Sequence, residues 1–310
     1  MRKKEIGFFT SVLILTLIAL GFAHAPIQAQ SVSIPSPLKN GKPGEYDLTV
    51  NFSGYSQAPG SVKVMVFIPV GVAGKDRPVL VFFHGNTRDR GYYRDSVDYM
   101  KNRAQKFGFI LISAQNWWSL GNGDVRGAND SRMAVNLILN NLKDDDIFDP
   151  DRVYPIGFSA GGYVAVLAFV NSLNQFDDQS IALYAEQMDG VDEDEVVKHY
   201  YSQTGGVEMN LFDYAGFASF KGNYYEGYVD MNPFVEEYQE GWNRLVRDKV
   251  LFIAVGEKDV PRVRQQAPIA ADFFRMYAKV EPVFKIYPGE GHNLTEANWN
   301  DFWTLVDPPK

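Results

Sequence analysis

Short apolar runs alternate with segments of helical periodicity along most of this 310-residue chain, and that alternation limits the possible folds more than any other feature. Uninterrupted apolar runs, which are typical of strands buried on both faces of a parallel sheet, occur at residues 78–83, 108–113, 152–157, 249–255 and 282–287. Apolar residues at the three-to-four spacing of a helix occur at residues 92–106, 130–142, 162–171, 267–279 and 295–305. This order predicts the α/β class, with a mostly parallel sheet and helices on both of its faces.

Two more strands are predicted ahead of this alternation. Apolar and polar side chains alternate in residues 46–52 and 62–68, which is the pattern of half-buried strands. The turn-rich stretch between them favours an antiparallel pair. Within the apolar run at residues 152–157, Pro155 removes a backbone donor, so we expect a bulge or a distorted pairing in that strand.

The N-terminus has the layout of a secretory signal peptide. Basic residues at positions 2–4 precede an almost uncharged run, residues 6–23, which is followed by small-residue cleavage sites. We therefore expect residues 1–29 to be removed and the protein to be secreted or periplasmic, with no stable membrane association after cleavage. The run is also just long enough for an uncleaved membrane anchor, which is the alternative. Since the chain has no cysteine, an exported protein of this sequence relies on its hydrophobic core instead of disulfides.

Composition divides the rest of the chain. Residues 30–45 are rich in Ser, Pro and Gly and predict a linker, whereas residues 46–310 predict one α/β domain. Eight acidic residues and no Lys or Arg occur in residues 176–195, where the strand–helix pattern is interrupted. We interpret about residues 172–210 as a small cap insertion in this domain.

The charge balance excludes one class of partner. The chain has 30 Lys and Arg against 38 Asp and Glu, which makes its formal net charge -8. Because binding to a phosphate backbone needs a basic face, and no Lys/Arg cluster follows the first four residues, we expect no nucleic-acid partner. The sequence also has no H-E-x-x-H motif and no paired metal-binding histidines, so we predict no metal site.

The sharpest local motif is the pentapeptide Gly157-Phe158-Ser159-Ala160-Gly161, a G-x-S-x-G pattern between a predicted strand and a predicted helix. A serine on such a sharp turn has its Oγ exposed, and flanking glycines avoid clashes between the turn, the strand and the helix. The start of the following helix adds free N–H groups and a positive dipole end where an oxyanion forms. We therefore predict that Ser159 is a nucleophile.

A serine nucleophile needs a base, and the base needs an acid that orients it. His292 follows the last predicted strand, in a loop at the carboxyl edge of the sheet, and is the predicted base. Asp259 ends the preceding strand and is the predicted acid, with Glu257 as its rival. The chain order Ser159, Asp259, His292 matches one of the known orders of a catalytic triad.

In the motif and the predicted triad, the chain resembles an α/β-hydrolase of the serine esterase and polyester-depolymerase type, which includes the feruloyl esterases. The stretch of residues 148–162 is its most family-like part. The resemblance implies the α/β-hydrolase fold, with an oxyanion hole formed by the backbone N–H groups of Asn86 and Ala160. It also implies that His84, in the same tripeptide as Asn86, is a hydrogen-bonding residue of the scaffold.

Together these features predict an exported serine hydrolase that cleaves carboxylic esters through an acyl-enzyme and needs no cofactor. The expected substrate is a small-molecule or polymeric ester, and Trp117 and Trp118, at the same edge of the sheet, are expected to line its pocket. An aromatic pocket in an acidic neighbourhood favours neutral or cationic esters over anionic ones. A serine peptidase on the same fold and a catalytically inactive binding protein are the alternatives.

Overall fold

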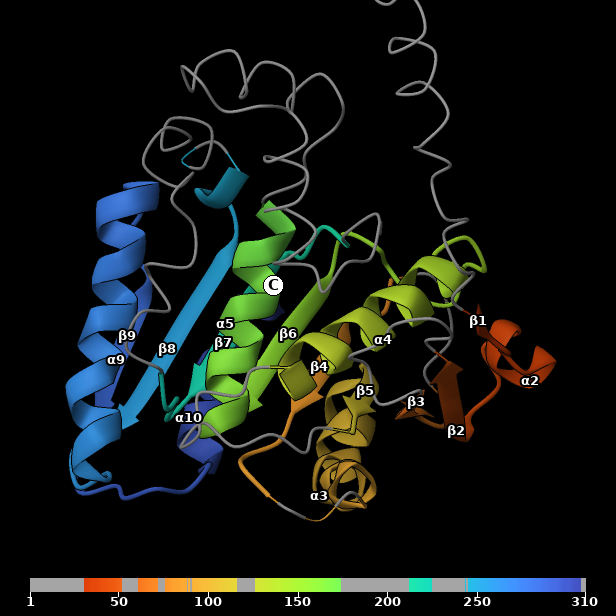
Figure 1. The fold of residues 1–310 in the computed structure, drawn as a ribbon, viewed down its shortest axis with the longest axis horizontal. Coiled ribbons are helices and arrows are strands. Elements are labelled where there is room, and N and C mark those ends of the chain that lie inside the picture. Colours follow the sequence, from red (N-terminus) through yellow and green to blue (C-terminus); the bar gives the residue numbers. More distant parts are fainter. Residues whose placement is uncertain are drawn as a thin grey trace, which may run out of the picture.

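The described residues form one nine-stranded sheet with the strand order β1-β2-β3-β5-β4-β6-β7-β8-β9 (Figure 1). The computed structural model describes residues 31–51, 61–71, 76–87, 89, 91–115, 126–173, 212–224, 243 and 245–307. The strands are β1 (Ser31–Val32), β2 (Gly44–Asn51), β3 (Ser61–Ile68), β4 (Val79–Phe83), β5 (Ile110–Ala114), β6 (Val153–Phe158), β7 (Gly216–Phe220), β8 (Val250–Gly256) and β9 (Val283–Tyr287).

Each helix predicted from the sequence is present in the structure. The helices are α2 (Ser36–Lys39), α3 (Tyr92–Phe107), α4 (Arg126–Leu142), α5 (Ala160–Leu173), α9 (Pro261–Phe273) with its π-helical continuation η2 (Phe274–Ala278), and α10 (Glu296–Val306). One boundary differs clearly, because α9 begins at Pro261 instead of residue 267. A proline is favourable in the first turn of a helix, where its missing N–H has no intrahelical partner to lose.

The sheet is mostly parallel, as predicted. From β5 through β4, β6, β7 and β8 to β9, every neighbouring pair is parallel. The strands β1, β2 and β3 pair antiparallel with one another, and β3 joins the rest through an antiparallel pairing with β5. The predicted antiparallel pair at the start of the domain is therefore confirmed.

The core has two layers because the central strands are buried on both faces. Alternate residues of β4, such as Val81 and Phe83, belong to a cluster that also contains apolar residues of α4, α5 and α9. The residues between them, such as Leu80 and Phe82, belong to a second cluster with α3 and α10. Both faces of β4 thus need apolar side chains, which explains its uninterrupted apolar run.

Part of the predicted linker belongs to the domain, so that prediction was wrong for residues 31–45. The strand β1 pairs with the end of β2, and Leu38 of α2 is fully buried in the cluster that contains α4 and α5. Pro37 lies in the first turn of α2, where proline is compatible with a helix. Ser and Pro therefore start a short helix here, and one apolar side chain anchors it.

The distortion expected at Pro155 is absent from the pairing of β6 with β4. The pairing of β4 with β6 runs without a break in register along the whole of β4. On the other side of β6, the Ala215 N–H donates to the Val153 carbonyl, and alternate residues of a parallel strand bond to the same neighbour. The missing N–H of Pro155 therefore faces β7, whose pairing with β6 begins only at Ile156.

Two of the predicted segments lie outside the described residues. These are the signal peptide, residues 1–29, and the cap insertion beyond Leu173. Among the helices that the structure does describe, none combines the length and the hydropathy needed to span a bilayer.

Replacement of Leu38 by Ala tests whether residues 31–45 are part of the folded domain. We expect Leu38→Ala to lower the free energy of unfolding by about 2–5 kcal/mol, because it leaves a cavity at a fully buried site. Urea titration followed by circular dichroism measures the change. The exposed neighbour provides the control, since Lys39→Ala should alter stability by less than about 0.5 kcal/mol. A Leu38→Ala loss as small as that of the control would contradict the packing described above.

Candidate active site

Ser159 lies on a sharp turn between β6 and α5. Its φ is +56°, a left-handed conformation that is uncommon for a residue with a side chain. Backbone hydrogen bonds hold the turn on both sides. The Ser159 N–H donates to the Phe220 carbonyl at 3.0 Å, and its carbonyl accepts from the N–H groups of Gly162 at 2.9 Å and Asn223 at 3.0 Å. The end of β7 thus fixes the turn that carries the serine.

The glycines of the motif allow a close approach between backbones. A Cβ atom at Gly157 would lie 2.0 Å from the carbonyl oxygen of Gly161, and one at Gly161 would lie 1.8 Å from that of Phe83 in β4. Both distances are far shorter than a van der Waals contact. The start of α5 therefore rests directly on the backbone of β4 and β6, and no side chain fits at either position.

The structure brings the three predicted triad residues together. The His292 Nε2 lies 2.9 Å from the Ser159 Oγ, and the His292 Nδ1 lies 2.6 Å from the Asp259 Oδ1. The carboxylate of Asp259 is fully buried and also accepts from the N–H groups of Val260 at 2.8 Å and Gly256 at 3.4 Å. A hydrogen on Nδ1, donated to this carboxylate, leaves Nε2 free to accept the serine hydroxyl hydrogen.

Glu257, the rival acid, has a different partner. Its Oε2 accepts the N–H of Gly289 at 2.7 Å, at the start of the loop that carries His292. The geometry therefore favours Asp259 as the residue that orients the imidazole.

The two amides predicted for an oxyanion hole flank the serine. Ala160 begins α5 directly after Ser159, and Asn86 follows Gly85, where an added Cβ would lie 3.4 Å from the Ser159 Cβ. In the part of the chain that the structure describes, neither the Asn86 N–H nor the Ala160 N–H donates to a protein acceptor. Two such amides beside a serine hydroxyl can bind a developing oxyanion.

His84 has the surroundings of a scaffold residue. Its side chain is buried, its Nδ1 lies 2.8 Å from the Gly85 carbonyl oxygen, and its ring meets that of Tyr92 edge to face. Burial penalises the charged imidazolium and lowers the pKa of His84. A neutral imidazole that donates to a carbonyl supports the loop before Asn86.

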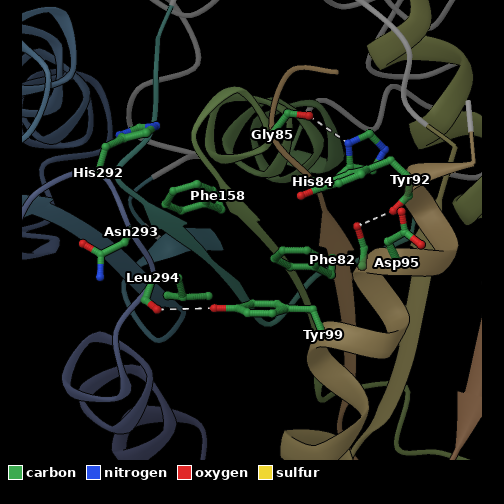
Figure 2. A pocket seen from close by; sticks show the side chains of 11 residues that line it. Phe82, His84, Gly85, Tyr92, Asp95, Tyr99, Phe158, His292, Asn293 and Leu294 are labelled. Carbon is green, nitrogen blue, oxygen red and sulfur yellow. Dashed lines mark hydrogen bonds between the residues drawn. The ribbon is translucent and has the colours of Figure 1, made fainter. Parts of the chain in front are cut away.

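A cavity of about 310 Å³ opens beside His292 (Figure 2). Phe158, which packs against the imidazole with ring centroids 4.9 Å apart, lies on one side together with Leu294, and residues of α3, including Tyr92 and Tyr99, lie on the other. Most of the cavity surface is apolar, and Asp95 and Asn293 are among its polar groups. The 28% exposure of the His292 side chain leaves it accessible from this side.

Sequence reasoning missed this cavity. Its two walls come from α3 and from the loop after β9, which are almost 200 residues apart in the sequence. A hydrogen bond from the Tyr99 hydroxyl to the Leu294 carbonyl joins the two walls. One signal was present in the sequence, because Tyr92 and Tyr99 are seven residues apart and share a helix face. In the structure, Tyr92 is 42% exposed and Tyr99 is 49% exposed. The predicted pocket residues Trp117 and Trp118 lie outside the described residues.

The described residues contain no group of three or more His, Asp or Glu side chains arranged to hold a metal ion.

Comparison with known proteins finds esterases and a depolymerase. The family model named BD-FAE matches residues 66–216. Over 131 residues, the chain is 25% identical to poly(3-hydroxyalkanoate) depolymerase C of Paucimonas lemoignei, a match that covers 39% of this chain and 31% of that protein. In a second alignment, also of 131 residues, it is 27% identical to the bifunctional acetylxylan esterase/xylanase XynS20E of Neocallimastix patriciarum, and this match covers 41% of this chain and 19% of that protein. The matched part thus spans less than a third of either relative.

Among solved structures, the chain is similar to Thermogutta terrifontis esterase 2 phosphorylated by paraoxon, with a TM-score of 0.50 and 12% identity. The match covers 92% of this chain and 97% of that one. At this identity the likeness concerns the fold alone, and it confirms the fold predicted from the sequence.

Replacement of Gly161 by Ala tests the close packing at the turn. The added methyl group would overlap the Phe83 carbonyl, so we expect the free energy of unfolding to fall by about 1–3 kcal/mol or more. Urea unfolding monitored by tryptophan fluorescence gives the change. At Gly91 the nearest atom to an added methyl is the end of the flexible Asp89 side chain, so Gly91→Ala should change stability by less than about 0.5 kcal/mol. Equal stability of the two variants would refute the backbone contact.

Proposed function

Because this chain has the α/β-hydrolase fold, we propose that it is an exported serine hydrolase that cleaves carboxylic esters through an acyl-enzyme. The observation that carries the proposal is the hydrogen-bonded series from Asp259 through His292 to Ser159. The names of the two curated relatives, a polyester depolymerase and an acetylxylan esterase, support an ester as the substrate. No cofactor takes part in the steps that follow.

In the first step, the Ser159 Oγ attacks the ester carbonyl carbon while its proton moves to the His292 Nε2. The Asp259 carboxylate accepts a hydrogen bond from the Nδ1–H group and balances the charge of the imidazolium. Hydrogen bonds from two backbone N–H groups hold the Asp259 carboxylate in place for this role. The carbonyl oxygen becomes an oxyanion, which the N–H groups of Asn86 and Ala160 bind.

The second half of the reaction regenerates the serine. The tetrahedral intermediate collapses when His292 gives its proton to the departing alkoxide. The alkoxide leaves as an alcohol, and the acyl group stays on the Ser159 Oγ. A water molecule then gives a proton to His292 and attacks the acyl carbon. Collapse of this second intermediate releases the carboxylic acid and returns the proton to Ser159.

The cavity beside His292 is the proposed binding site for one side of the ester. Its aromatic and apolar lining suits an uncharged group. The carboxylate of Asp95 in the same lining opposes a second negative charge, so neutral or cationic esters are the proposed substrates in preference to anionic ones. Trp117, Trp118 and the cap are proposed to contribute further contacts.

Replacement of Ser159 by Ala tests the proposed nucleophile. With a short aryl ester as substrate, we expect kcat to fall by roughly 10⁴–10⁶, since the variant lacks the attacking oxygen. The wild type should also be labelled by a fluorophosphonate probe, and Ser159→Ala should not. A folded wild type that is neither labelled nor active on esters would instead support the inactive binding protein, and faster turnover of a peptidyl amide than of the ester would support the peptidase.

Two further variants separate the candidate acids in the same assay. Asp259→Asn removes the charge that orients the imidazole, and such a change costs about 10⁴ in kcat in a related triad. Glu257→Gln should cause a much smaller loss, because the Glu257 carboxylate is hydrogen-bonded to the N–H of Gly289 and not to the imidazole. The reverse ranking would assign the acid to Glu257.

Export is proposed from the N-terminal pattern and is tested separately. When the full chain is expressed in a bacterial host with a general secretion pathway, we expect the protein in the periplasm or medium to begin near residue 30. Intact-mass spectrometry reads the new terminus. β1 begins at Ser31, so cleavage there keeps the folded domain complete. A full-length product retained in the membrane would favour the anchor.

A further inference from the structure

We propose that Lys221 and Glu290 form an ion pair that positions the loop carrying His292, and that this pair maintains the geometry needed for proton transfer. The inference rests on the proposed function and adds two positioning residues to it. Neither residue lines the cavity, so neither is placed to touch a substrate.

Lys221 is the first residue after β7, and its whole side chain is buried. Its backbone is left-handed, with a φ of +52°, and its N–H donates to the Ala254 carbonyl of β8 at 2.7 Å. The ammonium Nζ lies 2.8 Å from the Glu290 Oε2 and 2.8 Å from the carbonyl oxygen of Gly291. Gly291 directly precedes His292. A buried ammonium is unfavourable unless it is paired, so both contacts are needed to keep it there.

Glu290 extends the connection to the start of α10. Its Oε1 accepts from the Thr295 hydroxyl at 2.9 Å, and its Oε2 accepts from the Asn298 side chain at 3.0 Å. Thr295 is the N-cap of α10, and Asn298 completes its capping box. Burial alone raises the pKa of Glu290, but the hydrogen bonds from Lys221, Asn298 and Thr295 outweigh it and hold the pKa below its ordinary value. The carboxylate is therefore ionised at neutral pH.

The loop backbone has further anchors on the acid side of the triad. The Glu290 carbonyl accepts the Lys258 N–H at 2.8 Å, directly before Asp259. At Gly256 an added Cβ would lie 2.4 Å from that same carbonyl, so the loop rests on the end of β8. With Lys221 on one side and Lys258 on the other, residues 290 and 291 are held between β7, β8 and α10.

This arrangement matters because His292 must meet two partners at once. The imidazole contacts Asp259 at 2.6 Å and Ser159 at 2.9 Å, and a shift along the loop lengthens one contact or the other. A displacement of about 1 Å in a catalytic group can cost about 10²-fold in rate. Two glycines, Gly289 and Gly291, give the loop conformational freedom that the ion pair restricts.

The test compares Lys221→Met with a matched control, Lys249→Met. Lys249 also has a mostly buried side chain and an ion pair, with Asp213 at 2.7 Å, but it precedes the amino end of β8, away from the site. We expect Lys221→Met to lower kcat for a short aryl ester by about 10–100-fold, with KM changed by less than about threefold. Lys249→Met should leave both constants close to those of the wild type.

Glu290→Gln and the double variant test whether the two residues act as one unit. Glu290→Gln keeps the size of the side chain and should lower kcat by a smaller factor than Lys221→Met. The double variant should be no less active than Lys221→Met, because the residues of one network are non-additive. Multiplied losses would show independent effects and would overturn the pair as the positioning device.

Hydrogen exchange of the loop gives a readout that does not depend on activity. Amides in residues 288–295 should exchange faster in Lys221→Met than in the wild type and Lys249→Met. A folded Lys221→Met with unchanged kcat and unchanged loop exchange overturns the proposal, as does an equal loss of kcat in Lys249→Met. A wild type without ester hydrolysis contradicts the proposed function alone, since exchange still reports whether the ion pair holds the loop.

Discussion

Backbone contact between the start of α5 and the strands β4 and β6 is the constraint on which the site depends. It requires glycine at positions 157 and 161, and it forces Ser159 between them into a left-handed turn. The same contact brings the Gly85 loop against the serine, so the hydroxyl and the two amides proposed to bind the oxyanion share one small region. Packing of the fold and placement of the Ser159 hydroxyl are therefore consequences of a single feature.

Strand order supplies the rest of the site. Because β6, β7, β8 and β9 are neighbours and parallel, the segments that follow them emerge at one edge of the sheet. Ser159 follows β6, Lys221 follows β7, Asp259 follows β8 and His292 follows β9. The segments after β7, β8 and β9 thus each place one side chain in the hydrogen-bonded network around Ser159. Ser159 and Lys221 directly follow their strands, so sheet geometry sets their positions, whereas His292 lies five residues after β9 and depends on the contacts of its loop.

The sequence predicted the parts of this arrangement that have a local signature. Uninterrupted apolar runs reveal strands with two buried faces, and the G-x-S-x-G motif identifies the turn at Ser159 because strand and helix lie on either side of it. Lys221 has no such signature, since a lone lysine after a strand is usually solvated and only the fold buries it. Leu38 was missed for a related reason, because Ser and Pro nearby are typical of linkers and a single apolar residue shows no periodicity. The cavity likewise depends on segments far apart in the chain.

The choice of an ion pair at Lys221 and Glu290 has a physical reason beyond stability. Two apolar side chains of similar volume would often stabilise a protein as well as a buried ion pair does, because each charge loses its hydration. Apolar contacts, however, are non-directional and tolerate sliding, whereas the Lys221 ammonium has two acceptors at hydrogen-bond distance and one of them is the backbone carbonyl beside His292. A directional contact at that carbonyl limits movement of the loop along the sheet edge, which is the movement that separates the imidazole from the serine. The pair is therefore better suited to fixing a position than to adding stability.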